Sequence, residues 1–299
     1  MAEAINNVSS KRIAVVTGAN KGIGLEICRQ LASQGVTVVL TARDEGRGTE
    51  AVEKLKNSEV SDVLFHQLDV ADPASVASLA NFIKTQFGKL DILVNNAGVG
   101  GMTGTPPTFK EEENGFERFM KLLEVAKETP ETAEECLNIN YYGMKRVTEA
   151  LIPFLQQAKA PRIVNVTSIY GQLRSIPGES IKKAMGDVDE KTEARLDETL
   201  QSYVKELKEG KLNSVWPTKP TCYILSKAAM NTYTRLLAKR FPSACVNCVA
   251  PGSIKTDINY NTGILTAEEG AKGPVMLALL PDGGPSGLFY DQSEIVPFE

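Results

Sequence analysis

The stretch VVTGANKGIGLEI, residues 15–27, decides the fold, because it joins an apolar strand to an amphipathic helix through three glycines. These are Gly18, Gly22 and Gly24. Glycines at such a turn let backbone N–H groups approach a pyrophosphate, and the helix N-terminus adds the positive end of its dipole. An ordinary strand-to-helix turn is the alternative. The position of the stretch in the first such unit of the chain favours a dinucleotide site.

Short β-branched runs alternate with helical stretches along most of the chain. The expected strands are RIAVVT (12–17), VTVVLTA (36–42), VLFHQLDV (63–70), LDILVN (90–95), PRIVNVTS (161–168) and ACVNCVAPG (244–252). Strands this apolar suit a parallel sheet that helices cover on both faces. We therefore predict an α/β fold, a Rossmann-type doubly wound parallel sheet, with ligands beyond the carboxyl ends of the strands.

Two segments are long for connections inside a compact domain. They are residues 99–131, after the fourth strand, and residues 169–220, after the fifth. We expect both insertions to form a lid or a substrate wall. Since no Gly/Ser linker or internal repeat separates parts of the chain, residues 1–299 are predicted to form a single domain.

The composition argues against several classes of protein. A formal charge of −4 lacks the basic excess of a nucleic-acid binder, and no apolar stretch approaches the roughly 20 residues of a membrane span. No signal-peptide pattern opens the sequence, so the protein is predicted to be cytosolic and the sequon at Asn7 to be unused.

Cysteine and histidine usage argues against disulfides and metal. The five cysteines are scattered and odd in number, which is not typical of a disulfide framework. Cys245 and Cys248 belong to an expected strand, where positions three apart face opposite ways, so we interpret them as packing residues. With His66 as the single histidine, a multi-histidine metal site is excluded and no metal is predicted.

The end of the second strand bears on the choice of cofactor. A free ribose 2′-hydroxyl is usually held by a carboxylate at this place, but here Ala42 is followed by Arg43, and Lys21 lies in the glycine loop. Two cations suit a 2′-phosphate, so we predict NADP(H) rather than NAD(H). The alternative is that Arg43 is a solvated side chain beside Asp44 and Glu45.

Tyrosine and lysine stand four positions apart twice, at Tyr223 and Lys227 and at Tyr141 and Lys145. On a helix such residues share a face, and a nearby ammonium group lowers the pKa of a phenol from about 10. A tyrosine with a lowered pKa is a usable acid near neutral pH. Spacing alone does not choose between the two pairs.

The order of motifs resembles the short-chain dehydrogenase/reductase family over nearly the whole chain. The motifs are TGANKGIG (17–24), LDV (68–70), NNAG (95–98), NIN (138–140), NVTS (165–168), YILSK (223–227) and PGSIKT (251–256). The resemblance selects Tyr223, because the tyrosine of the family follows the serine strand.

The resemblance implies a catalytic tetrad. Ser168 would bind the substrate carbonyl, Tyr223 would donate the proton, Lys227 would hold the ribose and tune the phenol, and Asn140 would support a water-linked proton path. The residues implied to bind the cofactor are Gly18, Asn20, Lys21, Gly22, Ile23, Gly24, Arg43, Asp69, Val70, Asn95, Ala97, Gly98, Tyr223, Lys227, Pro251, Gly252 and Thr256.

Within the family, the 55-position gap between Ser168 and Tyr223 and the ending LALLPDGGPSGLFY are similar to plant reductases of the menthone, neomenthol and salutaridine type. That resemblance implies a monomer that reduces a hydrophobic monoterpenoid or alkaloid ketone, or oxidises the alcohol. Ser168 and Tyr223 would contact the substrate. The remaining candidates for an apolar pocket are Met102, Tyr170, Leu173, Ile258 and Ile264, each of which is equally compatible with loop packing.

Three other functions are alternatives to ketone reduction. One relative of the subgroup reduces a conjugated C=C bond and carries glutamate at the tyrosine position, whereas Tyr223 favours carbonyl chemistry. A non-catalytic NADP-binding regulator would be expected to lack a member of the tetrad, and this chain keeps all four. A dimeric scaffold would need an exposed apolar surface, but the insertions are rich in charge.

Overall fold

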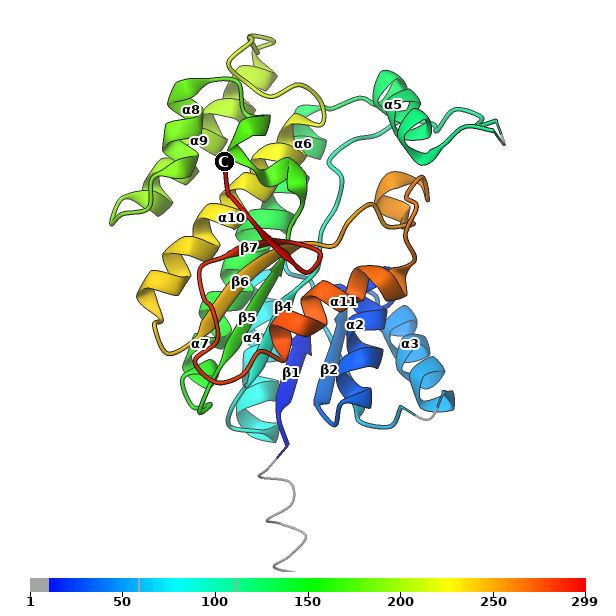
Figure 1. The fold of residues 1–299 in the computed structure, drawn as a ribbon, viewed down its shortest axis with the longest axis vertical. Helices are drawn as coiled ribbons and strands as arrows, with labels where there is room; N and C mark the ends of the chain where they lie inside the picture. Colours follow the sequence, from blue (N-terminus) through cyan, green and yellow to red (C-terminus); the bar gives the residue numbers. More distant parts are fainter. Residues whose placement is uncertain (1–10, 59, 111) are drawn as a thin grey trace, which may run out of the picture.

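The computed structural model describes residues 11–58, 60–110 and 112–299, so the sequon at Asn7 lies outside the described residues. Its centre is one eight-stranded sheet in the order β3-β2-β1-β4-β5-β6-β7-β8 (Figure 1). The strands are β1 Ile13–Val16, β2 Thr37–Ala42, β3 Val63–Gln67, β4 Ile92–Asn95, β5 Arg162–Val166, β6 Cys245–Ala250, β7 Phe289–Asp291 and β8 Glu294–Val296. All neighbours pair in parallel except β7 with β8, which confirms the predicted parallel sheet.

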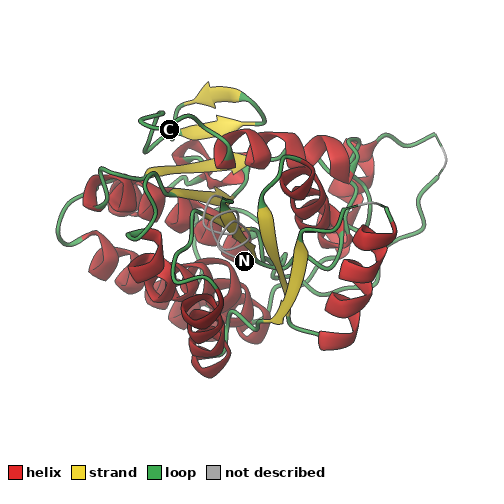
Figure 2. Ribbon diagram, turned by 90° about the horizontal axis from the view of Figure 1, so that it is seen from below, coloured by secondary structure: helices red, strands yellow, loops and turns green. Residues whose placement is uncertain are grey.

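Helices cover both faces of the sheet (Figure 2). One layer consists of α2 Gly22–Ser33, α3 Glu45–Asn57 and α11 Ala267–Ala278. The other layer is built on α4 Pro73–Gln86, α6 Pro130–Leu137, α7 Met144–Leu155 and α10 Thr221–Arg240. Alternate strand residues enter opposite layers: Ala14 packs toward α2, whereas Val15 packs toward α4 and α10. Burial on both faces explains why the strands are apolar at almost every position.

The two insertions contain helices of their own. Helix α5, Gly115–Val125, follows β4 and stands away from the rest of the molecule in Figure 1. Helices α8, Glu179–Gly186, and α9, Thr192–Lys208, follow β5. Leu196, Leu200 and Tyr203 of α9 are buried in the core cluster that includes α6 and α10. The segment after β5 is therefore part of the hydrophobic core and not a surface loop.

The sequence did not predict the last two strands. With three residues each, β7 and β8 are too short to show a strand period. Pairing with β6 places Phe289 in the interior, and Phe298 of the C-terminal segment packs on it with ring centroids 5.8 Å apart. The predicted third strand also ends early, at Gln67, and Leu68 and Val70 beyond it are buried in the core.

No helix in the part of the chain that the structure describes is long and apolar enough to cross a membrane. All five cysteines are free and buried. The thiol of Cys245 contacts the carbonyl oxygen of Gly284, and that of Cys248 the carbonyl oxygen of Leu288. The interpretation of these two cysteines as packing residues is confirmed.

Candidate active site

The glycine loop after β1 is shaped by close backbone approach. Gly18 has a φ of +62°, and a Cβ built on it would lie 2.8 Å from the Cα atom of Ala97. A Cβ on Gly24 would lie 2.5 Å from Nδ2 of Asn96 and 2.7 Å from the carbonyl oxygen of Gly18. Both contacts are shorter than a real side chain tolerates, so these glycines are required for the loop to fold over the end of β4.

Asn96 holds this loop in place, although the sequence did not single it out. Its side-chain amide donates to the carbonyl oxygens of Thr17 and Gly18, both at 3.0 Å. The hydroxyl of Thr17 in turn accepts the N–H groups of Asn96 and Ala97, also at 3.0 Å. Asn96 belongs to the motif NNAG, of which only Asn95, Ala97 and Gly98 were predicted to bind the cofactor.

The first turn of α2 offers N–H donors to a ligand. Lys21 is the N-cap residue and its side chain caps no backbone N–H. The Lys21 ammonium instead pairs with Asp257, and Gly22 faces the neighbouring Thr256. The segment after β6, which contains Pro251, Gly252 and Thr256, therefore lies beside the glycine loop. Asn20 of the loop and Ile23 of the first turn of α2 are half-buried.

A pocket of 430 Å³ lies at the carboxyl ends of β2 and β3 and is lined by Arg43, His66, Gln67, Asp69, Asp72, Ser75 and Ser78. Arg43 is exposed at its rim, while the adjacent Asp44 caps α3 through the N–H of Arg47. Asp69 accepts the N–H of Ala71 at 2.9 Å, which sets the turn that leads past Val70. The lining is polar and combines the Arg43 cation with the carboxylates of Asp69 and Asp72.

Asn140 lies in a π-helical turn, Asn138–Gly143, between α6 and α7. It is fully buried, and its amide group bonds both backbone groups of Val99: Oδ1 accepts the N–H at 2.8 Å and Nδ2 donates to the carbonyl oxygen at 3.0 Å. Nδ2 also lies 3.0 Å from Oγ of Ser226, which donates to the carbonyl oxygen of Tyr223 at 2.8 Å. Asn140 is thus connected to the backbone of the predicted proton donor.

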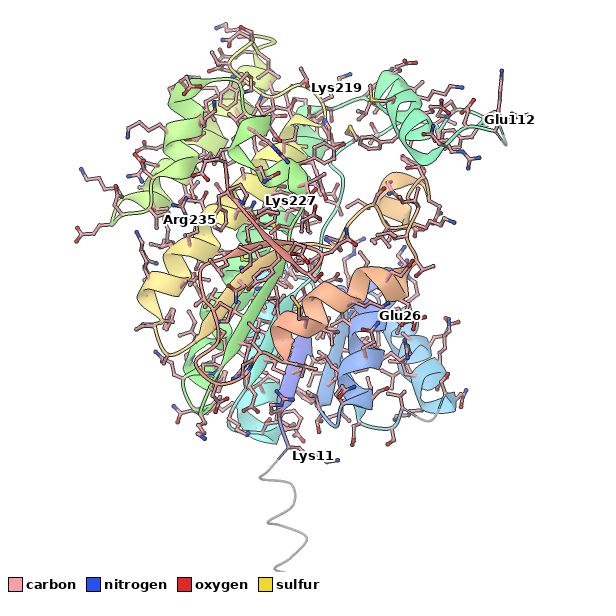
Figure 3. All side chains as sticks on the ribbon, viewed as in Figure 1. Lys11, Glu26, Glu112, Lys219, Lys227 and Arg235 are labelled. Atoms are coloured by element: carbon pink, nitrogen blue, oxygen red, sulfur yellow. The ribbon has the colours of Figure 1, made fainter. Side chains whose placement is uncertain are left out.

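Ser168, Tyr223 and Lys227 meet beyond the end of β5. The Ser168 hydroxyl lies close enough to the phenol of Tyr223 to lower its pKa, and the Lys227 ammonium lies 5.5 Å from the centroid of that ring. Lys227 also donates to the carbonyl oxygen of Val166 at 3.0 Å. A Cβ on Gly98 would lie 3.2 Å from Oδ1 of Asn140 and 3.7 Å from Nζ of Lys227. The structure therefore gathers all four residues of the predicted tetrad, with Lys227 near the centre of the molecule (Figure 3).

Burial dominates the titration of this group. It lowers the pKa of Lys227, a residue that is only 4% exposed, from 10.5 to about 8. It raises the pKa of Tyr223, against the opposite effect of the neighbouring Ser168 hydroxyl. The phenol is therefore protonated at neutral pH, as a proton donor must be. The predicted lowering of this pKa by Lys227 is not found, because the pKa is raised and Lys227 is not among the groups that shift it.

The second tyrosine and lysine pair lies away from this site. Tyr141 is fully buried in the core, and among the described residues its hydroxyl has no hydrogen-bond partner. Lys145 pairs with Glu193 of α9. Asn95 also faces the interior, where its amide donates to Thr148 and Asn165, so it supports the end of β4 from behind.

The predicted substrate residues have different environments. Tyr170 is exposed beside Ser168 and stacks on Phe119 of α5, with ring centroids 6.1 Å apart. Met102 is half-buried, while Ile258 and Ile264 are exposed on the loop after β6. Leu173 is buried in the core cluster that includes α10, so for this residue the packing alternative holds.

Comparison with known proteins agrees with this geometry. Residues 12–180 match the family model described as short chain dehydrogenase. The chain is 55% identical over 302 residues to short-chain dehydrogenase/reductase 1 of Saponaria officinalis, with 100% of both chains covered. It is 53% identical to (+)-neomenthol dehydrogenase of Arabidopsis thaliana, in an alignment that covers 96% of this chain and 98% of the relative.

A solved structure shows the same architecture. Salutaridine reductase from Papaver somniferum superposes with a TM-score of 0.86 at 50% identity, over 94% of this chain and 99% of that one. The glycine loop, the buried asparagine and the assembled serine, tyrosine and lysine are thus found in a chain whose sequence and fold both match one family. This protein belongs to the short-chain dehydrogenase/reductase family, whose members bind a nicotinamide cofactor.

Proposed function

We propose that the protein is an NADPH-dependent reductase that converts a hydrophobic ketone to a secondary alcohol, and that also catalyses the reverse oxidation. The observation that carries the proposal is the assembly of Ser168, Tyr223, Lys227 and Asn140 at the carboxyl ends of β4 and β5, next to the glycine loop. The names of the two plant relatives, neomenthol dehydrogenase and salutaridine reductase, support a terpenoid or alkaloid ketone as the substrate class.

The residues present fit a nicotinamide dinucleotide phosphate. The uncapped first turn of α2 provides N–H donors for a pyrophosphate, and the rim of the 430 Å³ pocket carries the Arg43 guanidinium where a carboxylate would favour NAD(H). Lys21 is a second cation on this side, and it would exchange its partner Asp257 for the 2′-phosphate. These features support NADP(H) over NAD(H).

The protein's own residues would then transfer one proton to the substrate and stabilise the negative charge that develops on its oxygen. The cofactor, when bound, supplies the hydride that the carbonyl carbon receives. Ser168 donates a hydrogen bond to the carbonyl oxygen and stabilises the negative charge that develops there. Tyr223 transfers its phenolic proton to that oxygen, so that the C=O bond becomes H–C–O–H. Lys227 would hold the ribose of the cofactor. Asn140 would support the water-linked path by which the phenol regains a proton.

The two insertions would form the substrate wall of a single catalytic domain. The stacking of Phe119 on Tyr170 joins the insertion after β4 to the one after β5, directly beside Ser168. Met120 and Val125 of α5 and Ile258 of the loop after β6 are exposed apolar side chains on segments that follow β4 and β6. An apolar wall with few polar anchors suits an oxygen-poor ketone.

The test is to measure NADPH consumption, with NADH as the control, against cyclic monoterpenoid ketones, bulky alkaloid ketones and enones. Products are identified by chiral chromatography. We expect secondary alcohols and a preference for NADPH. A saturated ketone from an enone would instead identify C=C reduction, and tight NADPH binding without turnover of any substrate would identify a regulator. The monomeric state and the cytosolic location remain predictions.

A further inference from the structure

Helix α10 carries Tyr223 in its first turn but has no local cap. Its N-cap residue, Pro220, has no side-chain acceptor, and the first N–H groups of a helix find no partner within the helix. The N–H of Cys222 donates instead to Oε1 of Glu128 at 2.5 Å. Glu128 is 94 positions earlier in the chain, in the segment that joins α5 to α6. A residue from the first insertion therefore caps the helix that carries the predicted proton donor.

The carboxylate of Glu128 is itself held by the second insertion. The hydroxyl of Tyr203, in α9, donates to the same Oε1 atom at 2.8 Å. Tyr203 is fully buried and packs on Trp216, with ring centroids 5.4 Å apart. Burial and the adjacent carboxylate raise the pKa of Tyr203, so its hydroxyl stays protonated and remains a donor.

A second contact joins the same two segments. The ammonium group of Lys219, just before α10, donates to the carbonyl oxygen of Ala126 at 3.0 Å, and Figure 3 shows Lys219 on the side of α10 that faces α5. The negative charge of Glu128 is also favourable at the positive end of the helix dipole. Hydrogen bonds to an ionised acceptor are roughly twice as strong as neutral ones, which makes this cap a firm one.

We propose that Glu128 is a positioning residue for the reduction: by capping α10 one residue before Tyr223, it sets the place of the phenol relative to Ser168. This inference rests on the proposed function, in which Tyr223 donates the proton. Tyr203 is the second member of the clamp, because it fixes the carboxylate. The two insertions would thus act on the chemistry through α10 as well as by enclosing the substrate.

A matched pair on the same helix provides the control. Near the middle of α10 the hydroxyl of Tyr233 donates to Oε1 of Glu149, on α7, at 3.3 Å. This is also a buried tyrosine paired with a glutamate, but it lies ten positions beyond Tyr223 and contacts no tetrad residue through this bond. Removing the hydrogen bond between Tyr233 and Glu149 therefore shows how the loss of a tyrosine–glutamate contact on α10 affects activity and stability in general.

The experiment compares Glu128→Ala, Glu128→Gln and Tyr203→Phe with Glu149→Ala, Tyr233→Phe and Tyr223→Phe. For each variant kcat and KM for a ketone, NADPH affinity by fluorescence, the solvent deuterium isotope effect on kcat, and the thermal midpoint are measured. For Glu128→Ala we expect kcat to fall by about 10²-fold, because small displacements of a reacting group have effects of this size. NADPH affinity should not change, and the isotope effect should rise because proton transfer becomes slower.

The conservative variants separate positioning from general stability. Glu128→Gln keeps an oxygen acceptor and should recover most of kcat, and Tyr203→Phe should show a smaller loss with the same rise in isotope effect. The Glu149 and Tyr233 variants should lower the thermal midpoint without changing the isotope effect. If the Glu128 and Tyr203 variants keep wild-type kcat and isotope effect while Tyr223→Phe is inactive, the positioning role is refuted and the proposed function stands. If Tyr223→Phe is fully active, the proposed function itself fails.

Discussion

At the scale of single residues, the environment of each tyrosine decides whether its hydroxyl can do chemistry. Tyr223 and Tyr141 both precede a lysine by four positions, but Tyr223 meets Ser168 whereas the hydroxyl of Tyr141 has no partner among the described residues. We expect Tyr223→Phe to lower kcat by about 10²- to 10⁴-fold, the usual contribution of a general acid, with NADPH affinity unchanged. Steady-state kinetics and fluorescence titration measure both quantities.

Tyr141→Phe is the matched control for this substitution. It removes the same atom from a buried ring and should leave kcat unchanged, because no hydrogen bond among the described residues is lost. A Tyr223→Phe enzyme as active as the Tyr141→Phe enzyme would contradict the assignment of the proton donor.

The lowered pKa of Lys227 predicts an upper pH limit for ketone reduction. Burial lowers its pKa to about 8, so the ammonium form is present below that pH and is lost above it. Only the ammonium form carries the positive charge and three N–H donors, and Tyr223, with a raised pKa, stays protonated over the same range. We expect kcat/KM for reduction to fall as the pH rises through about 8. A pH profile at saturating NADPH measures this, and a rate that stays constant to pH 10 would contradict it.

At the scale of elements, the glycine loop depends on the absence of one side chain. In Gly24→Ala the new Cβ would lie 2.5 Å from Nδ2 of Asn96 and 2.8 Å from the Cα atom of Ala19, so the loop or Asn96 must shift. We expect a loss of about 1–3 kcal/mol of unfolding free energy, as for other overpacked sites, together with weaker NADPH binding. Chemical denaturation and fluorescence titration provide the two measurements.

The control for this element is Gly46→Ala, at an exposed position early in helix α3. There a Cβ meets only Oδ1 of Asp44, at 3.5 Å, which is an ordinary contact. Alanine in a helix is favoured over glycine by about 0.5–1 kcal/mol, so this variant should gain stability and keep NADPH affinity. Equal effects of the two substitutions would show that the close packing at Gly24 does not govern the loop.

At the scale of the whole molecule, α9 covers part of the helical layer that contains α6 and α10. Leu196, Leu200 and Tyr203 are buried there within the same chain, so this surface is not available to a second copy. We expect a monomer of 32.4 kDa in sedimentation equilibrium over a wide concentration range. A mass that doubles with concentration would contradict this.

The sequence predicted most of the fold because its pattern is local. Strand and helix periods, the glycine turn and the order of the motifs are all visible in short windows, and the structure places each of the six expected strands. The predictions missed features that depend on distant contacts. Strands β7 and β8 are too short to be recognised without β6 beside them, and Leu173 lies in a loop of the sequence but in the core of the fold.

By itself the sequence determined the parallel sheet and the place of the glycine loop, and through its resemblance to the family it predicted the tetrad of Asn140, Ser168, Tyr223 and Lys227. Only the tertiary structure decided the supports of these residues: Asn96 beneath the glycine loop, Ser226 between Asn140 and Tyr223, and Glu128 at the start of α10. Periodicity and motifs record which residue types a short segment needs. Burial and hydrogen-bond partners arise when segments far apart in the chain meet, so their effects on pKa and position exist only in the folded molecule.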